Sequence, residues 1–161
     1  MIKIASFSST FQADVIDVIL PVQREEFGFS STIESQPDLL DIPNFHQSGA
    51  GGFWIALDGT QVVGTIALRD IGNLQGALRK TFVRPTHRGK EYSVASRLLR
   101  HLVEASHGKL SDILLGTTER YLAAHRFHEK NGLNRLAESA LPEAFPRAAA
   151  LTRFYQLKLP E

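Results

Sequence analysis

The sequence contains no cysteine, which excludes disulfide bonds, thiolate metal ligands and a cysteine nucleophile. It has no apolar run long enough to cross a membrane, and residues 1–7 (MIKIASF) lack the apolar core of a secretory signal. Low-complexity tracts and internal repeats are missing as well. These absences favour a folded cytoplasmic protein over a secreted, fibrous or membrane protein.

The composition is typical of a globular protein, with 43% hydrophobic and 22% charged residues, and we expect residues 1–161 to form one domain. The charges are divided unevenly along the chain. Residues 1–60 contain eight acidic and two basic residues, whereas residues 61–161 contain nine acidic and 16 basic ones. A basic half suits a polyanionic ligand and an acidic half a cationic one, although both can be solvated surfaces.

Apolar residues recur with strand or helical spacing along the chain. The strongest signal is the Asp58-Gly59 turn between two β-rich runs, which predicts a hairpin. Pro21 is expected to kink or end the first helix, and Pro43 to end the second. The order β-α-α-β-β-β-α-β-α-β-β predicts an α+β domain with a mixed, mostly antiparallel sheet flanked by helices. Strands are expected at about 2–7, 53–57, 61–68, 76–83, 112–117, from 133 and at 150–159, and helices at about 11–22, 37–42, 93–107 and 120–130.

The segment from Phe82 to His107 joins a strand end, a basic turn and a strongly amphipathic helix. Pro85 cannot continue the strand ladder, so the chain turns there. A helix N-terminus offers unpaired N–H groups and the positive end of the helix dipole, which together bind phosphate. The segment therefore predicts an anion site, and the alternative is an ordinary turn with solvated charges. The basic residues around Gly89 are Arg84, His87, Arg88 and Lys90.

The turn from Arg88 to Ser93 (RGKEYS) resembles the pyrophosphate-binding signature Q/R-x-x-G-x-G/A of the GNAT superfamily of acyl-CoA-dependent N-acyltransferases. Two positions depart from that signature. Glu91 occupies the place of its first glycine, and Ser93 that of its second small residue.

A second segment, from Ala124 to Leu133 (AHRFHEKNGL), is similar to the GNAT segment A-x-x-F-Y-E-K-x-G-F. His128 stands where the family commonly has a tyrosine that donates a proton or hydrogen bond to the leaving thiolate, and Tyr121 stands where an asparagine is often found. At neutral pH an ordinary histidine carries its extra proton on only about a quarter of molecules, but neutral imidazole can still donate. Two readings of His128 therefore stay open: the general acid, or a helix histidine that lines the cleft.

The resemblance, which runs from about Phe53 to Leu159, implies direct attack of an amine on the thioester of acetyl-CoA, without a metal. It implies that the backbone of Phe82 and Val83 polarises the thioester carbonyl. The basic half of the chain would then suit coenzyme A, and the acidic half an amine. The cofactor-binding residues that the resemblance implies are Phe82, Val83, Arg88, Gly89, Lys90, Glu91, Tyr92, Ser93, Tyr121 and Phe127.

The incoming amine must lose its proton before it attacks, but no residue identifies itself as the base. The candidates are acidic or histidine side chains in the acceptor-side segment or after the strand at 112–117, and each is individually more typical of a surface residue. They are Glu25, Glu26, Asp41, His46 and Glu119.

Two other functions compete with N-acetyl transfer to a small-molecule or protein amine. The departures at Glu91, Tyr121 and His128 leave open a catalytically weak or inactive CoA-binding sensor on the same fold. Nucleic-acid binding is disfavoured because the net charge is only +1 and no aromatic ladder accompanies the basic residues. The sequence indicates no membrane partner, and a homodimer remains open.

Overall fold

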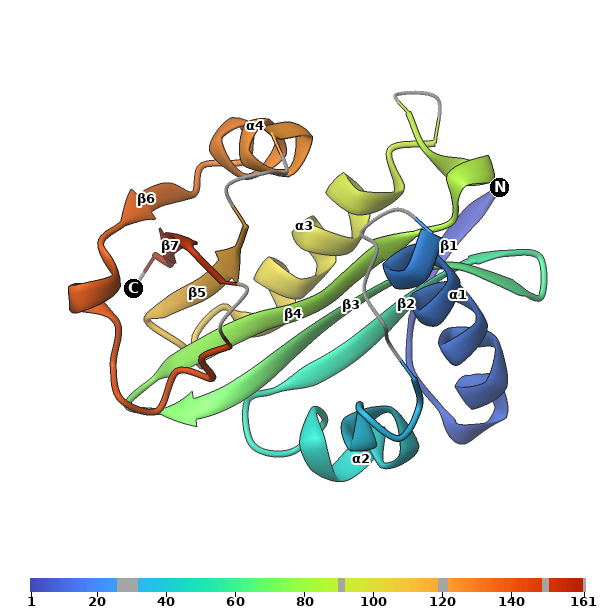
Figure 1. The fold of residues 1–161 in the computed structure, drawn as a ribbon, viewed down its shortest axis with the longest axis horizontal. Helices are drawn as coiled ribbons and strands as arrows, with labels where there is room; N and C mark the ends of the chain where they lie inside the picture. The colour runs from blue at the N-terminus through green and yellow to red at the C-terminus, as the bar shows by residue number, and fades with distance from the viewer. Residues whose placement is uncertain (26–31, 90–91, 119–121, 149–150, 161) are drawn as a thin grey trace.

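The computed structural model describes residues 1–25, 32–89, 92–118, 122–148 and 151–160. Within these ranges a seven-stranded sheet has the order β1-β2-β3-β4-β5-β7-β6 (Figure 1). The strands are β1 (Ile2–Ser6), β2 (Gly52–Asp58), β3 (Gln61–Gly72), β4 (Gln75–Val83), β5 (Asp112–Thr117), β6 (Asn134–Leu136) and β7 (Arg153–Lys158). The helices are α1 (Gln12–Glu25), α2 (Ile42–Phe45), α3 (Val94–Ser106) and α4 (Leu122–Lys130), with short 3₁₀ turns at Ser9–Phe11, Pro37–Leu40, Pro85–His87 and Glu138–Ala140.

The predicted fold class and order of elements are confirmed. Every neighbouring pair of strands is antiparallel except β4 and β5, which run parallel. The hairpin between β2 and β3 turns at Gly59, whose φ of +62° suits a glycine. The central part of the sheet is therefore a meander, β1 to β4, to which β5 is added through the crossover helix α3.

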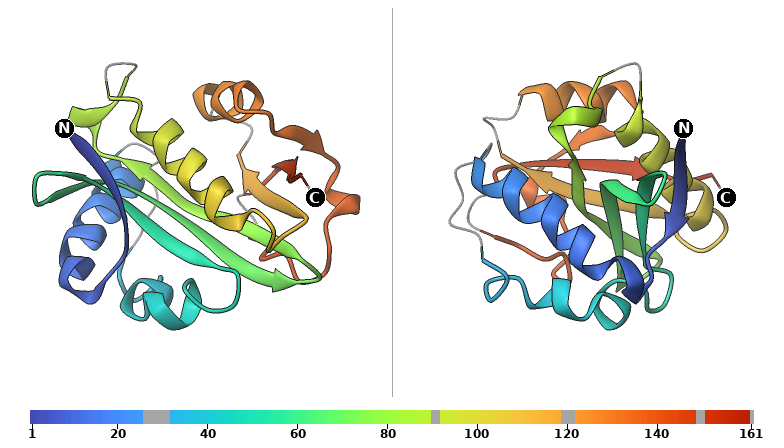
Figure 2. Two further views of the ribbon diagram at one scale, coloured as in Figure 1. Left: turned by 180° about the vertical axis from the view of Figure 1, so that it is seen from behind. Right: turned by 90° about the vertical axis from the view of Figure 1, so that its right-hand side faces the viewer.

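Each face of the sheet is covered by a different helix, as the view from behind shows with α3 in front of the strands (Figure 2). Alternating residues of β2 divide between the two faces: Phe53 and Ile55 pack with α1, whereas Trp54 and Ala56 pack with α3. Leu98 and Leu102 of α3 have no exposed surface. The period-2 pattern of the strands and the helical spacing of α3 thus fill the cores on the two sides.

Both prolines behave differently from the expectation. Pro21 lies inside α1, which continues to Glu25, because the buried residues Ile19 and Val22 hold the helix against the sheet on either side of it. Pro43 stands at the second position of α2 and does not end the helix before it. Its missing N–H is one of those that a helix start leaves unpaired in any case.

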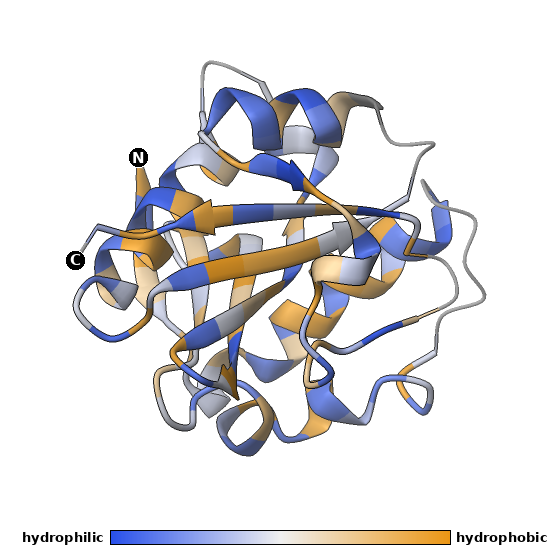
Figure 3. Cartoon of the chain, turned by 90° about the vertical axis from the view of Figure 1, so that its left-hand side faces the viewer, coloured by the Kyte–Doolittle hydropathy of each residue, from blue (hydrophilic) through white to orange (hydrophobic). Residues whose placement is uncertain are grey.

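Hydrophobic residues concentrate in the strands and on the helix faces that cover them, whereas α4, the helix at the top of Figure 3, is largely hydrophilic on its outer surface. A third apolar cluster covers β5 and β7 on the α1 side of the sheet and includes Leu141 and Phe145 of the segment after β6. None of the helices in the described ranges is both long and apolar enough to cross a membrane.

We expect Leu102→Ala to lower the free energy of unfolding by about 2–5 kcal/mol, because the side chain of Leu102 in α3 is fully buried in the core and its removal leaves a cavity. Urea denaturation at equilibrium measures this value. Leu40→Ala is the matched control, since Leu40 is 55% exposed and its truncation should change the stability by about 0.5 kcal/mol or less. Equal losses in the two variants would contradict this account of the core.

Candidate active site

The strands β4 and β5 separate part of the way along the sheet. They pair only from Gln75 to Ala77 on β4 and from Asp112 to Leu114 on β5. Beyond those residues β4 continues to Val83 and remains paired with β3, while β5 remains paired with β7. The sheet therefore has an opening between Leu78–Val83 and Leu115–Thr117, here called the splay.

Backbone alternation decides which N–H groups of β4 face the splay. The N–H of Arg84 donates to the carbonyl of Val63 at 2.8 Å, so this N–H points toward β3. Because the N–H groups of alternate residues point to the same edge of a strand, the N–H of Phe82 also points toward β3 and the N–H of Val83 points toward the splay. Of the two residues expected to polarise a thioester through their backbone, only Val83 is thus oriented toward the opening.

A β-bulge lies just before Phe82. Thr65 of β3 is opposite Phe82 of β4, and Ala67 is opposite Arg79. Two steps along β3 therefore correspond to three steps along β4, so β4 contains one extra residue. Lys80 adopts a left-handed φ of +55°, and its carbonyl accepts a 2.7 Å hydrogen bond from Thr65 Oγ1. The bulge locally twists the end of β4 and directs Lys80 toward the side of α1 and α2.

The predicted anion site forms the start of α3. The N–H of Arg97 donates to Ser93 O at 3.0 Å, which leaves the N–H groups of Val94, Ala95 and Ser96 without partners in the helix. The turn before them depends on Gly89, whose φ is +103°. An added Cβ at Gly89 would meet no atom within 4 Å, so the glycine serves the backbone conformation and the space beside it is open.

Three basic side chains of the turn are bonded to other parts of the protein. Arg84 donates to Val62 O and pairs with Asp17 at 3.2 Å. His87 contacts Asp58 at 2.9 Å, and Arg88 donates to Val83 O from two nitrogens, at 2.7 and 3.0 Å. Among the described residues of the turn, these bonds leave mainly backbone N–H groups for an anion. Lys90 and Glu91 lie outside the described residues, as do Tyr121, Glu26 and Glu119.

His128 lies on the buried side of α4, with its ring 5.4 Å from that of Tyr155 and 5.7 Å from that of Phe127. Burial, and to a smaller extent neighbouring His125, lower the pKa of His128 to about 4, against the opposing effect of Glu129. The side chain is therefore a neutral imidazole at pH 7. Its Nδ1 is buried and has no hydrogen-bond partner among the residues that the structure describes.

A hydrogen-bond network joins α4 to β7. Tyr155 donates from its hydroxyl to Glu129 at 2.7 Å, and Arg153 donates to His125 Nδ1 at 3.0 Å. Because that nitrogen accepts, His125 carries its proton on Nε2, which lies 2.7 Å from the carbonyl of Thr118. These contacts hold α4 against β7 and the end of β5, the strand that forms one side of the splay.

A buried ionic cluster lies on the α1 side of the sheet and was not predicted. Asp38 accepts a 2.9 Å hydrogen bond from His46 and lies 3.5 Å from the ammonium of Lys80. Lys80 also donates to Gln36 at 2.6 Å. The pKa of Asp38 is lowered to about 2, because the His46 hydrogen bond and the positive charge of Lys80 outweigh the opposing effect of burial. His46 had been a candidate base, but its place is in this cluster.

The other described candidates for the base do not gather at the splay. Glu25 is the exposed last residue of α1. Asp41 accepts hydrogen bonds from Asn44 three residues later. Neither of these two carboxylates is thus marked as the base by its position.

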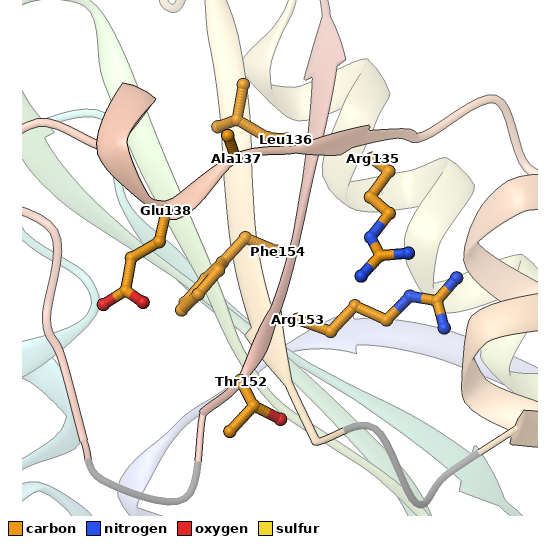
Figure 4. Close-up of a pocket in the computed structure, with 7 residues that line it drawn as sticks. All are labelled: Arg135, Leu136, Ala137, Glu138, Thr152, Arg153 and Phe154. Atoms are coloured by element: carbon orange, nitrogen blue, oxygen red, sulfur yellow. The ribbon is translucent and has the colours of Figure 1, made fainter.

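A cavity of about 450 Å³ is lined by residues of the paired strands β6 and β7 and of the segments next to them. Figure 4 shows the guanidinium groups of Arg135 and Arg153 directed toward α4, and Glu138 on the opposite side of the strand. The sheet order places these strands beyond β5, so the cavity is separate from the splay.

Comparisons with known proteins show to which family the chain belongs. The model of the acetyltransferase (GNAT) family matches residues 16–133. The chain belongs to this family, which confirms the predicted resemblance.

Among curated proteins, the N-acetylaspartate synthetase of Danio rerio is 34% identical over 107 residues, which are 63% of this chain. The matched region is 36% of that protein, so the chain spans only about a third of the length of this relative. A GNAT-family acetyltransferase from Staphylococcus aureus Mu50 has a TM-score of 0.92 and 29% identity, covering 99% of this chain and all of the other. An N-acetyltransferase from Thermoplasma acidophilum, solved in complex with coenzyme A, shares the fold with a TM-score of 0.75, covering 98% of this chain and 99% of the other at 16% identity.

We expect Asp38→Asn to destabilise the protein by about 2 kcal/mol at pH 7, because the folded state lowers the pKa of this carboxyl from 3.8 to about 2. A lowered pKa stabilises the fold above pH 4, and this contribution is lost as the pH falls toward 2. The stability difference between wild type and Asp38→Asn should therefore shrink over that range. Urea denaturation at several pH values tests it, with Asp41→Asn as the control in the same segment. A difference that does not depend on pH would disprove the ionic account.

Proposed function

We propose that this protein is an N-acetyltransferase that moves the acetyl group of acetyl-CoA to a primary amine. The observation that carries the proposal is the splay, with the N–H of Val83 at its edge and the open N-terminal turn of α3 beside it, in a chain that belongs to the acetyltransferase (GNAT) family. The names of the relatives agree with an amine as the acceptor.

The cosubstrate would be held by backbone groups and not mainly by the basic side chains. Its pyrophosphate would bind the N–H groups of Val94 to Ser96 and the positive end of the α3 dipole. The open space at Gly89 leaves room for phosphate oxygens. Arg88 would contribute by its bond to Val83 O, which ties the turn to the end of β4. Lys90, Glu91, Tyr92 and Phe127 keep their predicted roles as cofactor contacts.

The reaction is a direct transfer. The amine nitrogen forms a bond to the carbonyl carbon of the thioester, the carbon–sulfur bond breaks, and the thiolate leaves. The oxygen that becomes negative during attack would accept a hydrogen bond from Val83 N–H, which is fixed by the pairing of β4 with β3. The nitrogen proton would leave through water, because none of the described candidates Glu25, Asp41 and His46 is placed as a base, and the thiolate takes up a proton as it departs.

His128 would assist the thiolate as a neutral hydrogen-bond donor. With a pKa of about 4 the imidazole is not protonated at neutral pH, so its extra proton is not available. One ring nitrogen still carries a hydrogen, and Nδ1 has no partner in the described part of the chain. The cytoplasmic location and the homodimer considered from the sequence remain predictions.

Acetyl-CoA at a hundred times its Kd should stabilise the protein by about 2.7 kcal/mol, which thermal unfolding detects as a shift of a few degrees. In Arg88→Ala we expect the shift at the same concentration to be smaller, because the turn loses its tie to Val83. Arg100→Ala, at an exposed position of α3, is the matched control and should keep the wild-type shift. An absent shift in the wild type would overturn the proposal, and a normal shift without turnover of any amine would favour the CoA-binding sensor.

His128→Phe should lower kcat by about 10- to 100-fold while the KM for acetyl-CoA stays within about twofold, because only the departing thiolate loses its donor. His128→Tyr restores a donor on an aromatic ring and should recover most of kcat. Steady-state kinetics of the two variants with one amine checks this. Equal kcat in His128→Phe and wild type would assign His128 to the cleft lining.

A further inference from the structure

Two arginines occupy the α1 side of the sheet next to the splay. In the register of β3 with β4, Arg69 is opposite Ala77 and Arg79 is opposite Ala67. The two side chains are thus diagonal neighbours on one face, close enough for long side chains to meet. Arg69 is positioned there by Phe45 of α2, whose ring centre lies 5.9 Å from the guanidinium carbon.

The charges on this face do not balance. Asp38 is shared between Lys80 and His46, at 3.5 and 2.9 Å, so the carboxylate is already committed. Neither Arg69 nor Arg79 donates a hydrogen bond to any residue that the structure describes. Burial lowers the pKa of Arg79, Asp38 opposes this effect, and the charge of Arg69 adds to it. Arg79 is thus within electrostatic range of both Arg69 and Asp38, and it forms no ion pair with a carboxylate that the structure describes.

Other acidic groups near these strands are engaged elsewhere. Asp70, the neighbour of Arg69 in β3, accepts hydrogen bonds from the N–H groups of Ala50 and Gly72, both at 2.9 Å. Asp112 at the start of β5 accepts from Gln75 and Gln156. The excess positive charge on the α1 side therefore has no carboxylate available from these positions.

The position of Arg79 relates this charge to the proposed reaction. Arg79 follows Ala77, the last residue of β4 that pairs with β5, so it stands where the splay begins. The α3 turn, the proposed cofactor site, belongs to the helix that covers the opposite face (Figure 2). A second substrate that reaches the thioester through the splay from the α1 side would pass Arg79.

We propose that Arg79, assisted by Arg69, binds a carboxylate of the acceptor, so that the acceptor is an amine that also carries a carboxylate, as an α-amino acid does. Guanidinium matches carboxylate with two parallel hydrogen bonds, which would fix the amine relative to the splay. This inference rests on the proposed N-acetyl transfer. It differs from the cationic acceptor that the acidic N-terminal half suggested, because β3 and β4 bring two arginines to this face, whereas Asp38 is already paired with Lys80 and His46.

The test compares acceptors in pairs that differ only in the carboxylate. Steady-state transfer from acetyl-CoA is measured for the common α-amino acids and for the corresponding α-carboxamides. We expect turnover of at least one amino acid, with kcat/KM at least 10-fold above that of its carboxamide. In Arg79→Ala the KM for that amino acid should rise about 10- to 100-fold, while the KM for acetyl-CoA stays within about twofold.

Three variants separate binding from folding. Arg79→Lys keeps a positive charge without the two-nitrogen fork and should recover part of the affinity, Arg79→Met keeps the length of the side chain, and Arg100→Ala controls for loss of an arginine on the other face. The thermal shift with acetyl-CoA should be retained in all three. The comparison of amino acid with carboxamide uses only the wild-type protein and so does not depend on any variant's folding.

Carboxamides that react as well as the amino acids, or an unchanged acceptor KM in Arg79→Ala, would overturn this inference and leave the proposed acetyl transfer intact. Turnover only of amines without a carboxylate would do the same. A wild-type protein that acetyl-CoA does not stabilise would instead refute the proposed function itself, and this inference with it.

Discussion

The early end of the pairing between β4 and β5 is the constraint on which the site depends. A parallel pair that continued to Val83 would use the N–H of that residue in the ladder and close the sheet. The backbone at the end of β4 is rigid because it stays paired with β3. Its other edge is open because the pairing with β5 ends at Ala77. The crossover helix α3 begins at Val94, eleven residues after Val83, so a backbone donor and a helix N-terminus are brought together by one connection.

The bulge at Lys80 adds a second consequence to the same strand. An extra residue turns this lysine toward Asp38, and the buried ion pair ties the end of β4 to the 3₁₀ turn at Pro37–Leu40. The strand that supplies the proposed oxyanion donor is thereby held from both neighbours, by the β3 ladder and by the acceptor-side segment. Rigid support of this kind is what a preorganised donor requires.

The sequence predicted the order and nearly all the elements, because strand alternation and helical spacing are local properties. It predicted the α3 turn from Gly89 and the basic residues around it, although the structure shows His87 and Arg88 bonded within the protein. It could not predict the Asp38 cluster, since Lys80 meets Asp38 only through a bulge and 42 residues of separation. It also failed at Pro21, where buried neighbours outweighed the local preference of proline.

The two outer strands of the sheet determine how the molecule meets other proteins. One edge is β6, which has only three residues and exposes Arg135, and the other is β1, which exposes Lys3. A short edge and charged side chains are the devices by which sheets avoid adding strands from other chains. The fold can therefore keep an opening in the middle of its sheet, where unpaired backbone is useful, while its margins discourage edge-to-edge aggregation.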